Sequence, residues 1–423
     1  MLTSTGFNDF LSPYIQSQAW RCGLDPYSPE VLLQLWPAGA SHFVFLRNEV
    51  ANGTLVERRG IPTAYPLTAL VLLSPFSLIP WKAAYTAWMA FNLALFGLMV
   101  GTMVELAGLR HSEPKAILLM AATLALAPFQ TGIATGNSTL AAVELGVIAV
   151  YAARQRYEMV SAVLIALSAG LKPQIGICFL FYYMIRPRMR VFVAAAALLL
   201  VVGLAGWLRL EAGHTPWWTN YRNDNRMLLE SGVLGNFTEI NQTRFGLINL
   251  QVALYPMLAD VRRTNVLAAA IATALLAAWL IIALRRRRSP DSELLELSAP
   301  AVISLLPIYH RFYDAALLVL PLVWTFVCFG RGRERARERS RRFAVAGLLL
   351  MLPFLIPGGT LLEALQDRGS LPLGLTSHWW WQGLVMPHEV WLLLLLSGLL
   401  LYEMALPGAR GVQEPAHSAA KSD

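Results

Sequence analysis

Long runs of apolar residues, separated by short polar segments, dominate the chain beyond residue 62. The runs are roughly 15 to 25 residues long, and about 20 apolar residues in a helix cross a hydrocarbon core about 30 Å thick. A membrane barrel would instead show short strands of alternating hydrophobicity. We therefore expect an all-α polytopic membrane protein with about 11 transmembrane helices.

The expected spans share a high apolar content and polar flanks. They fall at residues 83–108, 115–129, 133–153, 158–171, 173–187, 190–211, 264–284, 293–309, 312–329, 343–358 and 389–406. A shorter apolar segment at 66–80 contains Pro75, which favours a re-entrant or interfacial segment. Residues 1–62 and 212–263 are rich in polar side chains, and we expect them to be extramembrane loops.

Clusters of basic residues orient this topology. They lie at residues 154–156, 186–190, 285–288 and 331–342. Short loops rich in Lys and Arg stay on the cytoplasmic side of a membrane. The turns at 129–137, 171–174 and 310–314, and the loops 1–62, 212–263 and 359–388, then face outward.

The outward position of residues 1–62 requires a crossing before them. No apolar segment precedes them in the sequence. Either the N-terminal segment crosses by itself or a further helix lies upstream; we favour the upstream helix, which would give about twelve spans with both ends cytoplasmic. Residues 1–410 then form a single integral membrane domain, and residues 411–423 a disordered cytoplasmic tail.

The amino-acid composition agrees with a membrane protein and argues against a soluble protein or a nucleic-acid-binding protein. Hydrophobic residues make up 56% of the 423 residues and charged residues 14%, with a mean hydropathy of +0.51. A soluble protein carries about 25% charged residues. The net charge of +8 resides mainly in the basic clusters, which lack interleaved aromatic residues, so we expect membrane lipids and no nucleic acid as partners. The three cysteines show neither a metal-binding spacing nor a disulfide framework.

The sequence SLLPIYHRFYDAALL at 304–318 places ionisable groups at an outward turn between two apolar segments. The groups are His310, Arg311 and Asp314, with Tyr313 beside them. Such a turn can be an ordinary polar connection. However, ionisable groups held at membrane level usually face a cavity or one another, which favours a functional site.

Other polar residues of kinds used in catalysis fall on the same predicted face. Asp25 before Pro26 also suits a turn, Asn137 also suits a helix cap, and Lys172 can extend to lipid headgroups. Together, acids, a histidine, amides and isolated cations suit a general base, a clamp for a leaving phosphate and recognition of a hydroxyl-rich acceptor. The additional candidates are Asp9, Asp25, Asn137, Lys172, Gln174 and Arg244.

The order of these motifs resembles a known family. The motifs are NDF at 8–10, GLDPY at 23–27, YP at 65–66, GN at 136–137, LKPQ at 171–174 and the H…YD turn at 310–314. Over roughly residues 8–330 the chain resembles glycosyltransferase family 87, the polyprenyl-phosphate-mannose-dependent mannosyltransferases with the membrane GT-C fold. It departs from the family pattern at YPL, where the family usually has YPP, and at GNS in place of GQ-N.

The resemblance implies roles for individual residues. The family's catalytic base is an aspartate in the first external loop, which matches Asp9 best and Asp25 second. The external histidine of the family, near the donor phosphate and the acceptor, matches His310. Lys172 would be a cation on the phosphate side. The remaining polar residues named above are candidates for binding donor phosphate or substrate.

The activity implied is transfer of a hexose, with mannose and an α-mannosyltransferase as the expectation. The donor would be a polyprenyl-phosphate sugar and the acceptor a glycan or glycolipid, at the outer face of the cell (inner) membrane. No paired-carboxylate metal motif is evident, so we expect metal-independent transfer without a cofactor. A transporter or lipid-linked-sugar flippase, and a lipid-linked-glycan ligase or polymerase, are the alternatives.

Overall fold

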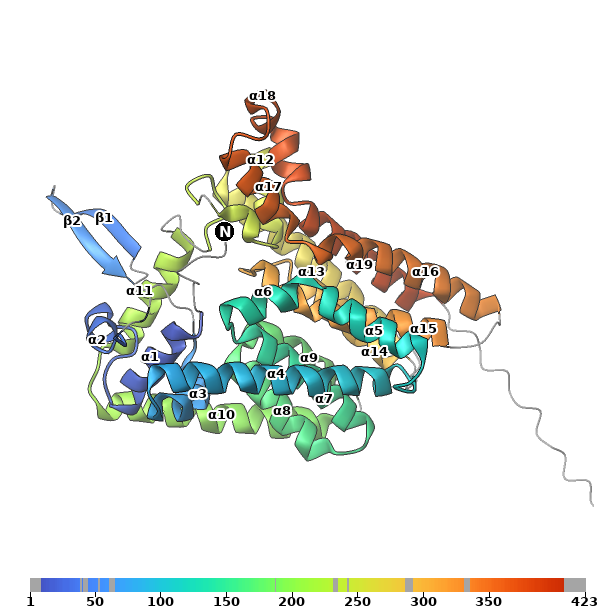
Figure 1. The fold of residues 1–423 in the computed structure, drawn as a ribbon, viewed down its shortest axis with the longest axis horizontal. Helices are drawn as coiled ribbons and strands as arrows, with labels where there is room; N and C mark the ends of the chain where they lie inside the picture. Colours follow the sequence, from blue (N-terminus) through green and yellow to red (C-terminus); the bar gives the residue numbers. More distant parts are fainter. Residues whose placement is uncertain are drawn as a thin grey trace, which may run out of the picture.

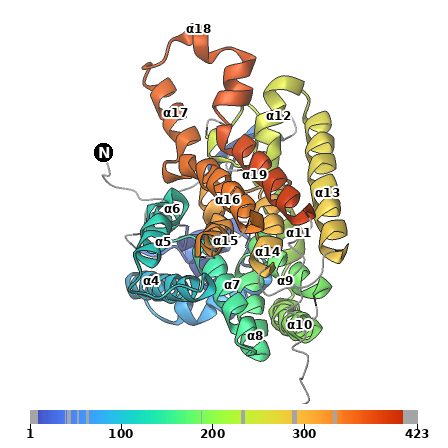
Figure 2. The ribbon, with the colours of Figure 1, turned by 90° about the vertical axis from the view of Figure 1, so that its right-hand side faces the viewer.

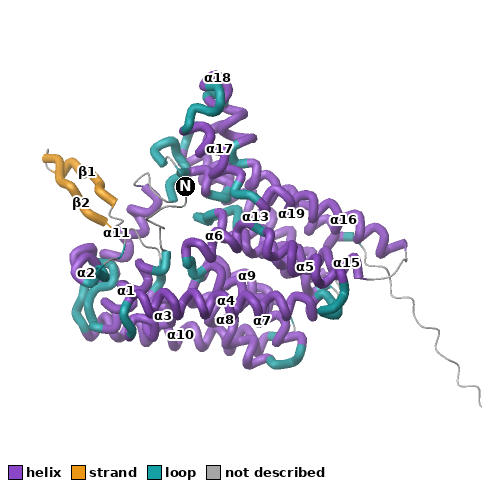
Figure 3. Tube along the Cα trace, viewed as in Figure 1, coloured by secondary structure: helices purple, strands orange, loops and turns teal. Residues whose placement is uncertain are grey.

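The computed structural model describes residues 9–38, 40, 45–51, 54–60, 65–186, 188–230, 235–241, 243–285, 292–330 and 335–406. In these residues the chain is a bundle of helices with one small hairpin (Figures 1 and 3). The predicted tail at 411–423 lies outside the described residues, as do residues 286–288 and 331–334 of the basic clusters.

The first half of the chain contains the hairpin and several short helices. Its elements are α1 (Leu11–Arg21), α2 (Pro29–Gln34), β1 (Phe45–Ala51), β2 (Thr54–Gly60), α3 (Leu67–Leu73), the 3₁₀ helix η1 (Ser74–Leu78), α4 (Trp81–Leu106), α5 (Pro114–Ala125), α6 (Ala127–Thr135), α7 (Thr139–Arg154), α8 (Glu158–Leu171), α9 (Pro173–Ile185) and α10 (Met189–Ala212). The two strands pair antiparallel. The hairpin was not predicted, because the polar N-terminal segment was expected to be a loop.

The second half alternates long helices with short helical turns. Its elements are α11 (Trp217–Glu230), η2 (Arg244–Gly246), α12 (Leu250–Leu258), α13 (Val261–Arg285), α14 (Glu293–Ser304), η3 (Phe312–Leu318), α15 (Val319–Gly330), α16 (Arg335–Met351), η4 (Leu352–Leu355), α17 (Gly358–Asp367), α18 (Leu373–Thr376), the π-helical turn η5 (Trp381–Val385) and α19 (His388–Ala405). The predicted loops at 212–263 and 359–388 therefore contain helices, and the basic segment at 331–342 continues into α16.

Fewer helices than expected are long enough to span a membrane. Among the described residues, six helical segments are sufficiently long and apolar, or seven if α5 and α6, bent by 52°, form one span. The six are 81–106, 189–212, 261–285, 312–329, 338–367 and 388–405. The expected count of about 11 spans is therefore not confirmed.

Several predicted spans are real helices that are short. The predictions at 158–171 and 173–187 correspond to α8 and α9, which have 14 and 13 residues. At 1.5 Å per residue each is about 20 Å long, less than a hydrocarbon core of about 30 Å. Apolar composition predicted these helices correctly, but it did not distinguish a complete span from a short buried helix. The segment at 66–80 is indeed broken, with α3 passing into η1 at Ser74.

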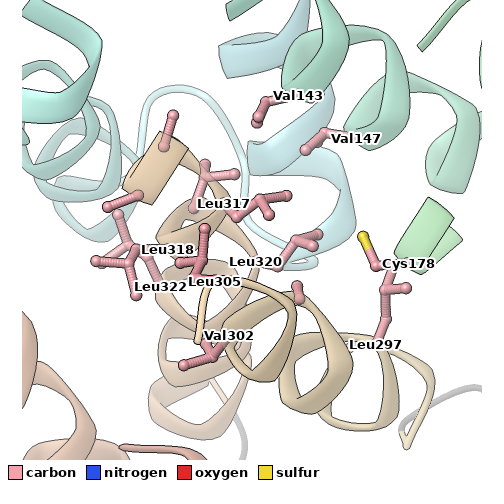
Figure 4. Close-up of a cluster of buried hydrophobic side chains, with 14 of the residues drawn as sticks. Val143, Val147, Cys178, Leu297, Val302, Leu305, Leu317, Leu318, Leu320 and Leu322 are labelled. Atoms are coloured by element: carbon pink, nitrogen blue, oxygen red, sulfur yellow. The ribbon is translucent and has the colours of Figure 1, made fainter. Parts of the chain in front are cut away.

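Helix α7 lies at the centre of the bundle and is buried along almost its whole length. It packs against α4, α8, α9 and η3. Apolar side chains from α7, α9, α14, η3 and α15 form the central core, which includes Val147, Cys178, Leu297 and Leu320 (Figure 4). Because neighbouring helices cover α7 on every side, its two ends are fixed relative to the rest of the bundle.

The two ends of α7 have different chemistry. At its C-terminal end Arg154 pairs with Glu293 at 2.7 Å and donates to Leu106 O, while Arg186 pairs with Glu296 nearby on α14. This end therefore holds Arg154 and Arg186, which belong to two of the basic clusters. At the N-terminal end of α7 lie the turns that the sequence placed together on one face of the membrane. In both views α12, α17 and α18 also form one extension of the bundle (Figures 1 and 2).

Candidate functional site

Asp9 is held where the chain enters α1. Its backbone N–H donates to Thr135 O at 2.8 Å, and its Oδ2 accepts a hydrogen bond from Asn137 Nδ2 at 2.7 Å. Burial raises the pKa of Asp9 to about 6, while the hydrogen bond from Asn137 and the nearby Arg311 lower it. Asp9 is thus a half-buried carboxylate poised to exchange a proton near neutral pH.

Asn137 lies in the turn that joins α6 to α7. Gly136 ends α6 with φ +66°, a conformation that favours glycine, and its carbonyl accepts from Trp88 Nε1 at 2.8 Å. The Oδ1 of Asn137 then accepts from Thr139 N at 2.9 Å. The side chain therefore fixes the start of α7 with its oxygen and contacts Asp9 with its nitrogen. Both predicted roles of Asn137, as a helix cap and as a site residue, are compatible with this geometry.

Lys172 occupies the break between α8 and α9. Pro173 disfavours helical backbone in the residue before it, and Lys172 has φ −147° and ψ 92°, an extended conformation. Its Nζ lies 2.6 Å from Asp314 Oδ1, 2.5 Å from Thr139 Oγ1 and 3.3 Å from Asn137 Oδ1. A lysine has three donors, so these contacts satisfy the ammonium group within the protein.

Asp314 is completely buried and forms the centre of the cluster. Besides Lys172, its Oδ1 lies 2.6 Å from Thr139 Oγ1. Its Oδ2 lies 3.0 Å from His310 Nδ1 and accepts from the backbone N–H of Arg311, also at 3.0 Å. This last bond is part of a reciprocal cap at the start of η3, because Asp314 N donates to Arg311 O. Local capping thus points the carboxylate inward.

One ring nitrogen of the histidine in this turn has a hydrogen-bonding partner, and the other has none among the described residues. His310 is fully buried, and its Nδ1 faces Asp314. Among the described residues, no hydrogen-bond partner reaches His310 Nε2. A buried nitrogen without a partner is uncommon in a folded protein and directs attention to a ligand at this position.

Two further residues of the turn border the cluster. The ring of Tyr313 lies beneath Lys172, with Nζ 4.7 Å from the ring centroid. Arg311 is half-buried, and its Nη2 donates to Thr243 Oγ1 at 3.4 Å. Asp9 and Arg311 interact electrostatically, so a guanidinium and a carboxylate lie near one another at the edge of the cluster.

The structure brings seven of the ten predicted site residues together. They are Asp9, Asn137, Lys172, His310, Arg311, Tyr313 and Asp314. The chain contributes them from four separate segments: the entry to α1, the start of α7, the α8–α9 break and the start of η3. The sequence predicted that these turns lie on the same side of the membrane, and in the structure they lie close together.

Three predicted residues lie elsewhere. Asp25 accepts from Tyr27 N at 2.9 Å and from Asn220 Nδ2 at 2.8 Å, which ties it to α11. Arg244 donates to Gln382 Oε1 at 2.8 Å, next to η5. Gln174 lies half-buried in the first turn of α9, two residues beyond Lys172.

Thr139 was not predicted to belong to the site. Its hydroxyl accepts from Lys172 and donates either to Asp314 or to Asn137 Oδ1, which lies 2.7 Å away. The sequence offered one indication that Thr139 belongs to the site: it lies two residues after Asn137 in GNST, in the first turn of a helix. Threonine is common at such positions for capping alone, so the motif did not distinguish the two uses.

A metal site is not evident in this region. In the part of the chain that the structure describes, no group of three His, Cys, Asp or Glu side chains is placed to hold a metal ion. The polar atoms of the cluster are carboxylates, an imidazole, amides, a hydroxyl and cations. These groups can move a proton and bind an anion.

A membrane-type helical bundle with such a cluster at one end of its central helix defines an integral membrane protein with an enzyme-like site. The chain belongs to glycosyltransferase family 87, whose family model matches residues 63–308. The match includes Asn137, Thr139 and Lys172, ends two residues before His310, and begins after Asp9. No curated protein and no solved structure matches the chain. The protein is therefore a membrane glycosyltransferase.

Proposed function

We propose that this glycosyltransferase moves a hexose, mannose, from a polyprenyl-phosphate donor to a hydroxyl group of a glycan or glycolipid acceptor. The reaction takes place at the outer face of the cell membrane, without a metal or cofactor. The observation that carries the proposal is that Asn137 links the Asp9 carboxylate to the buried ion pair of Lys172 and Asp314.

Asp9 serves as the general base. The acceptor oxygen attacks the anomeric carbon, the bond from that carbon to the phosphate oxygen breaks, and the hydroxyl proton passes to Asp9. The electron pair of the broken bond leaves with the polyprenyl phosphate. A base works best when its pKa lies near the operating pH, and the pKa of Asp9 is raised by burial to about 6.

The leaving phosphate is stabilised by the opposite side of the cluster. Arg311 is half-buried and interacts with Asp9, so its guanidinium lies beside the reacting groups. His310 offers Nε2, because Asp314 holds Nδ1. Lys172 has its three donors occupied within the protein, so its charge acts on the phosphate through space and by keeping Asp314 and Asn137 in position.

A lipid-linked donor suits the position of this cluster in the bundle. The polyprenyl chain stays in the bilayer, and its phosphate lies at the interface. The break between the short apolar helices α8 and α9, where Lys172 has extended backbone, supports such a position. Irregular backbone at that depth is tolerated where protein buries it or where it lines a cavity.

The test is transfer of radiolabelled sugar from polyprenyl-phosphate-mannose in membranes that contain the chain. Asp9→Asn removes the base and keeps the hydrogen-bonding shape. Asp260→Asn is the matched control, because Asp260 is exposed and caps α13 through Arg263 N. We expect a new labelled glycan or glycolipid, with at least a hundredfold loss of rate in Asp9→Asn only.

Each alternative makes a different prediction in this experiment. A ligase or polymerase would transfer a preassembled glycan and leave the single labelled sugar on its lipid. A flippase would move the lipid-linked sugar across the bilayer with no new glycosidic bond. Either result, or full activity of Asp9→Asn, would overturn the proposal.

A further inference from the structure

The residue that follows Asp9 is enclosed by aromatic side chains from two other elements. The ring of Phe10 stacks on Trp88 of α4, with 4.9 Å between the ring centroids and an interplanar angle of 6°. It also stacks on Trp81 at 6.0 Å and 20°, and Phe76 from η1 makes a T-shaped contact with it at 5.8 Å. Residues seven apart on a helix lie about 10.5 Å apart along its axis, so the phenyl ring fits between the two indoles.

This aromatic contact fixes a stretch of backbone that helix α1 does not hold by itself. Asp9 lies before the first residue of α1, and Pro13, four residues further on, has no N–H to donate to the Asp9 carbonyl. Phe10 and Trp88 are each only 1% exposed. A buried ring in a close-packed core has little freedom to move, so the Phe10 ring anchors the backbone of Asp9 on α4.

Trp88 also holds the hydrogen-bonding partner of Asp9. Its Nε1 donates to Gly136 O at 2.8 Å, and Gly136 directly precedes Asn137. Asn137 Nδ2 in turn donates to Asp9 Oδ2 at 2.7 Å. One indole therefore contacts the residue after Asp9 with its ring and the residue before Asn137 with its N–H.

We propose that Trp88 is a positioning residue for sugar transfer, which holds Asp9 and Asn137 at hydrogen-bonding distance without touching either substrate. The proposal rests on the proposed function, since it concerns the residue that serves there as the base. A base must lie within about 2.6–3.2 Å of the group whose proton it takes, and a misplacement of about 1 Å costs roughly a hundredfold in rate. The buried indole therefore acts on the rate through the position of Asp9.

The alternative is that Trp88 contributes only to stability, because a buried indole usually finds an acceptor for its N–H. A second tryptophan has the same surroundings away from the site. Trp279 of α13 is 4% exposed, and its Nε1 donates to Glu296 O, also at 2.8 Å. It lies near the ion pair of Arg186 and Glu296, at the opposite end of α7 from Asp9.

The experiment measures kcat, the KM for radiolabelled polyprenyl-phosphate-mannose and the melting temperature of the purified full chain. Trp88→Phe keeps an aromatic ring against Phe10 and removes the N–H, while Trp88→Leu removes both contacts. Trp279→Phe and Trp279→Leu are the matched controls. Asp9→Asn, alone and combined with Trp88→Phe, completes the set.

We expect kcat to fall about tenfold in Trp88→Phe and about a hundredfold in Trp88→Leu, with the donor KM within about twofold of the wild type. The Trp279 variants should lower the melting temperature by a similar amount and keep the kcat of the wild type. Trp88→Phe should cause no further loss of rate in the Asp9→Asn background, because the group that it positions is already gone.

Three results would overturn this proposal and leave the proposed function intact, provided that Asp9→Asn is strongly impaired. They are a wild-type kcat in Trp88→Phe, equal losses of kcat in the Trp88 and Trp279 variants, and a further loss of about tenfold when Trp88→Phe is added to Asp9→Asn. A fully active Asp9→Asn would instead overturn the proposed function, and this proposal with it.

Discussion

Lys172 and Asp314, 142 positions apart in the chain, form a buried ion pair with 2.6 Å between Nζ and Oδ1. The Asp314 side chain is 0% exposed and that of Lys172 10%. The pair joins the α8–α9 break to the start of η3, and it orients both Asn137 and His310. It is therefore the structural centre of the site as well as its main charge pair.

Breaking this pair should destabilise the fold more than removing it whole. Lys172→Met or Asp314→Leu leaves one buried charge without a counter-charge, which costs about 3–5 kcal/mol. The double variant leaves none, so its loss of stability should be smaller than the sum of the single losses. The measurement is the melting temperature of the detergent-solubilised protein for all four forms.

An exposed ion pair supplies the control for that cycle. Arg342 and Glu338 pair at 3.0 Å with side chains 80% and 62% exposed, and such pairs contribute about 0–1 kcal/mol. Arg342→Met should therefore leave the melting temperature nearly unchanged. Equal effects of Lys172→Met and Arg342→Met would contradict the structural role of the buried pair.

Acidification should switch off sugar transfer through Asp9. Burial raises the pKa of this carboxyl to about 6, and only the deprotonated form can accept the hydroxyl proton. Below that pH the rate should fall about tenfold per pH unit. Asn137→Ala removes a hydrogen bond that lowers the pKa, so it should move this limb of the pH–rate profile to higher pH. A transfer rate that stays constant from about pH 4.5 to about pH 7.5 would rule Asp9 out as the base.

Gly176 should not tolerate a methyl group. A Cβ at this position would lie 2.3 Å from the backbone N and Cα of Ala169, so α8 and α9 approach one another too closely for any side chain. Gly176→Ala should therefore push the two helices apart and displace Lys172 between them. We expect a lower melting temperature together with a loss of transfer.

The matched control for this change is Gly203→Ala in α10. There the added Cβ would meet Thr68 Cγ2 at 3.7 Å, an ordinary contact, and alanine is the better helix former. This variant should be as stable as the wild type or slightly more so. If both alanine variants behaved alike, close packing of α8 against α9 would not be what positions Lys172.

Asp25 should be dispensable for the chemistry. Its carboxylate is bound to Tyr27 N and to Asn220, and no hydrogen bond links it to the cluster around Lys172 among the described residues. Asp25→Asn should therefore lose less than about threefold in transfer rate, roughly 0.6 kcal/mol. A loss as large as that of Asp9→Asn would move the role of base to Asp25.

The same variant should change the dependence of stability on pH. Burial and the nearby Asp25 raise the pKa of Asp224 to about 8, and burial also raises the pKa of Asp25. Because its pKa is raised, each carboxyl binds more protons in the folded state than in the unfolded chain over part of the range between pH about 4 and 8. Stability should therefore fall as the pH rises from about 4 to 8, and fall less steeply in Asp25→Asn. Identical slopes of melting temperature against pH would contradict this coupling.

The amino-acid sequence by itself determined the local features. Apolar runs predicted the long helices at 81–106, 189–212, 261–285 and 388–405 to within a few residues. Pro173 fixed the break at Lys172, because the residue before a proline avoids helical backbone. These features follow from sterics and hydrophobic burial within one segment, so nearby residues suffice to predict them.

Only the tertiary structure decided which side chains meet. The partner of Lys172 lies far along the chain, the role of Thr139 depends on that partner, and Asp25 turned out to contact α11 instead of the cluster. The number of complete spans was likewise undecided, since short buried helices such as α8 are as apolar as long ones. Contacts of this kind result from how helices pack around α7, and packing depends on the shapes of many distant side chains together.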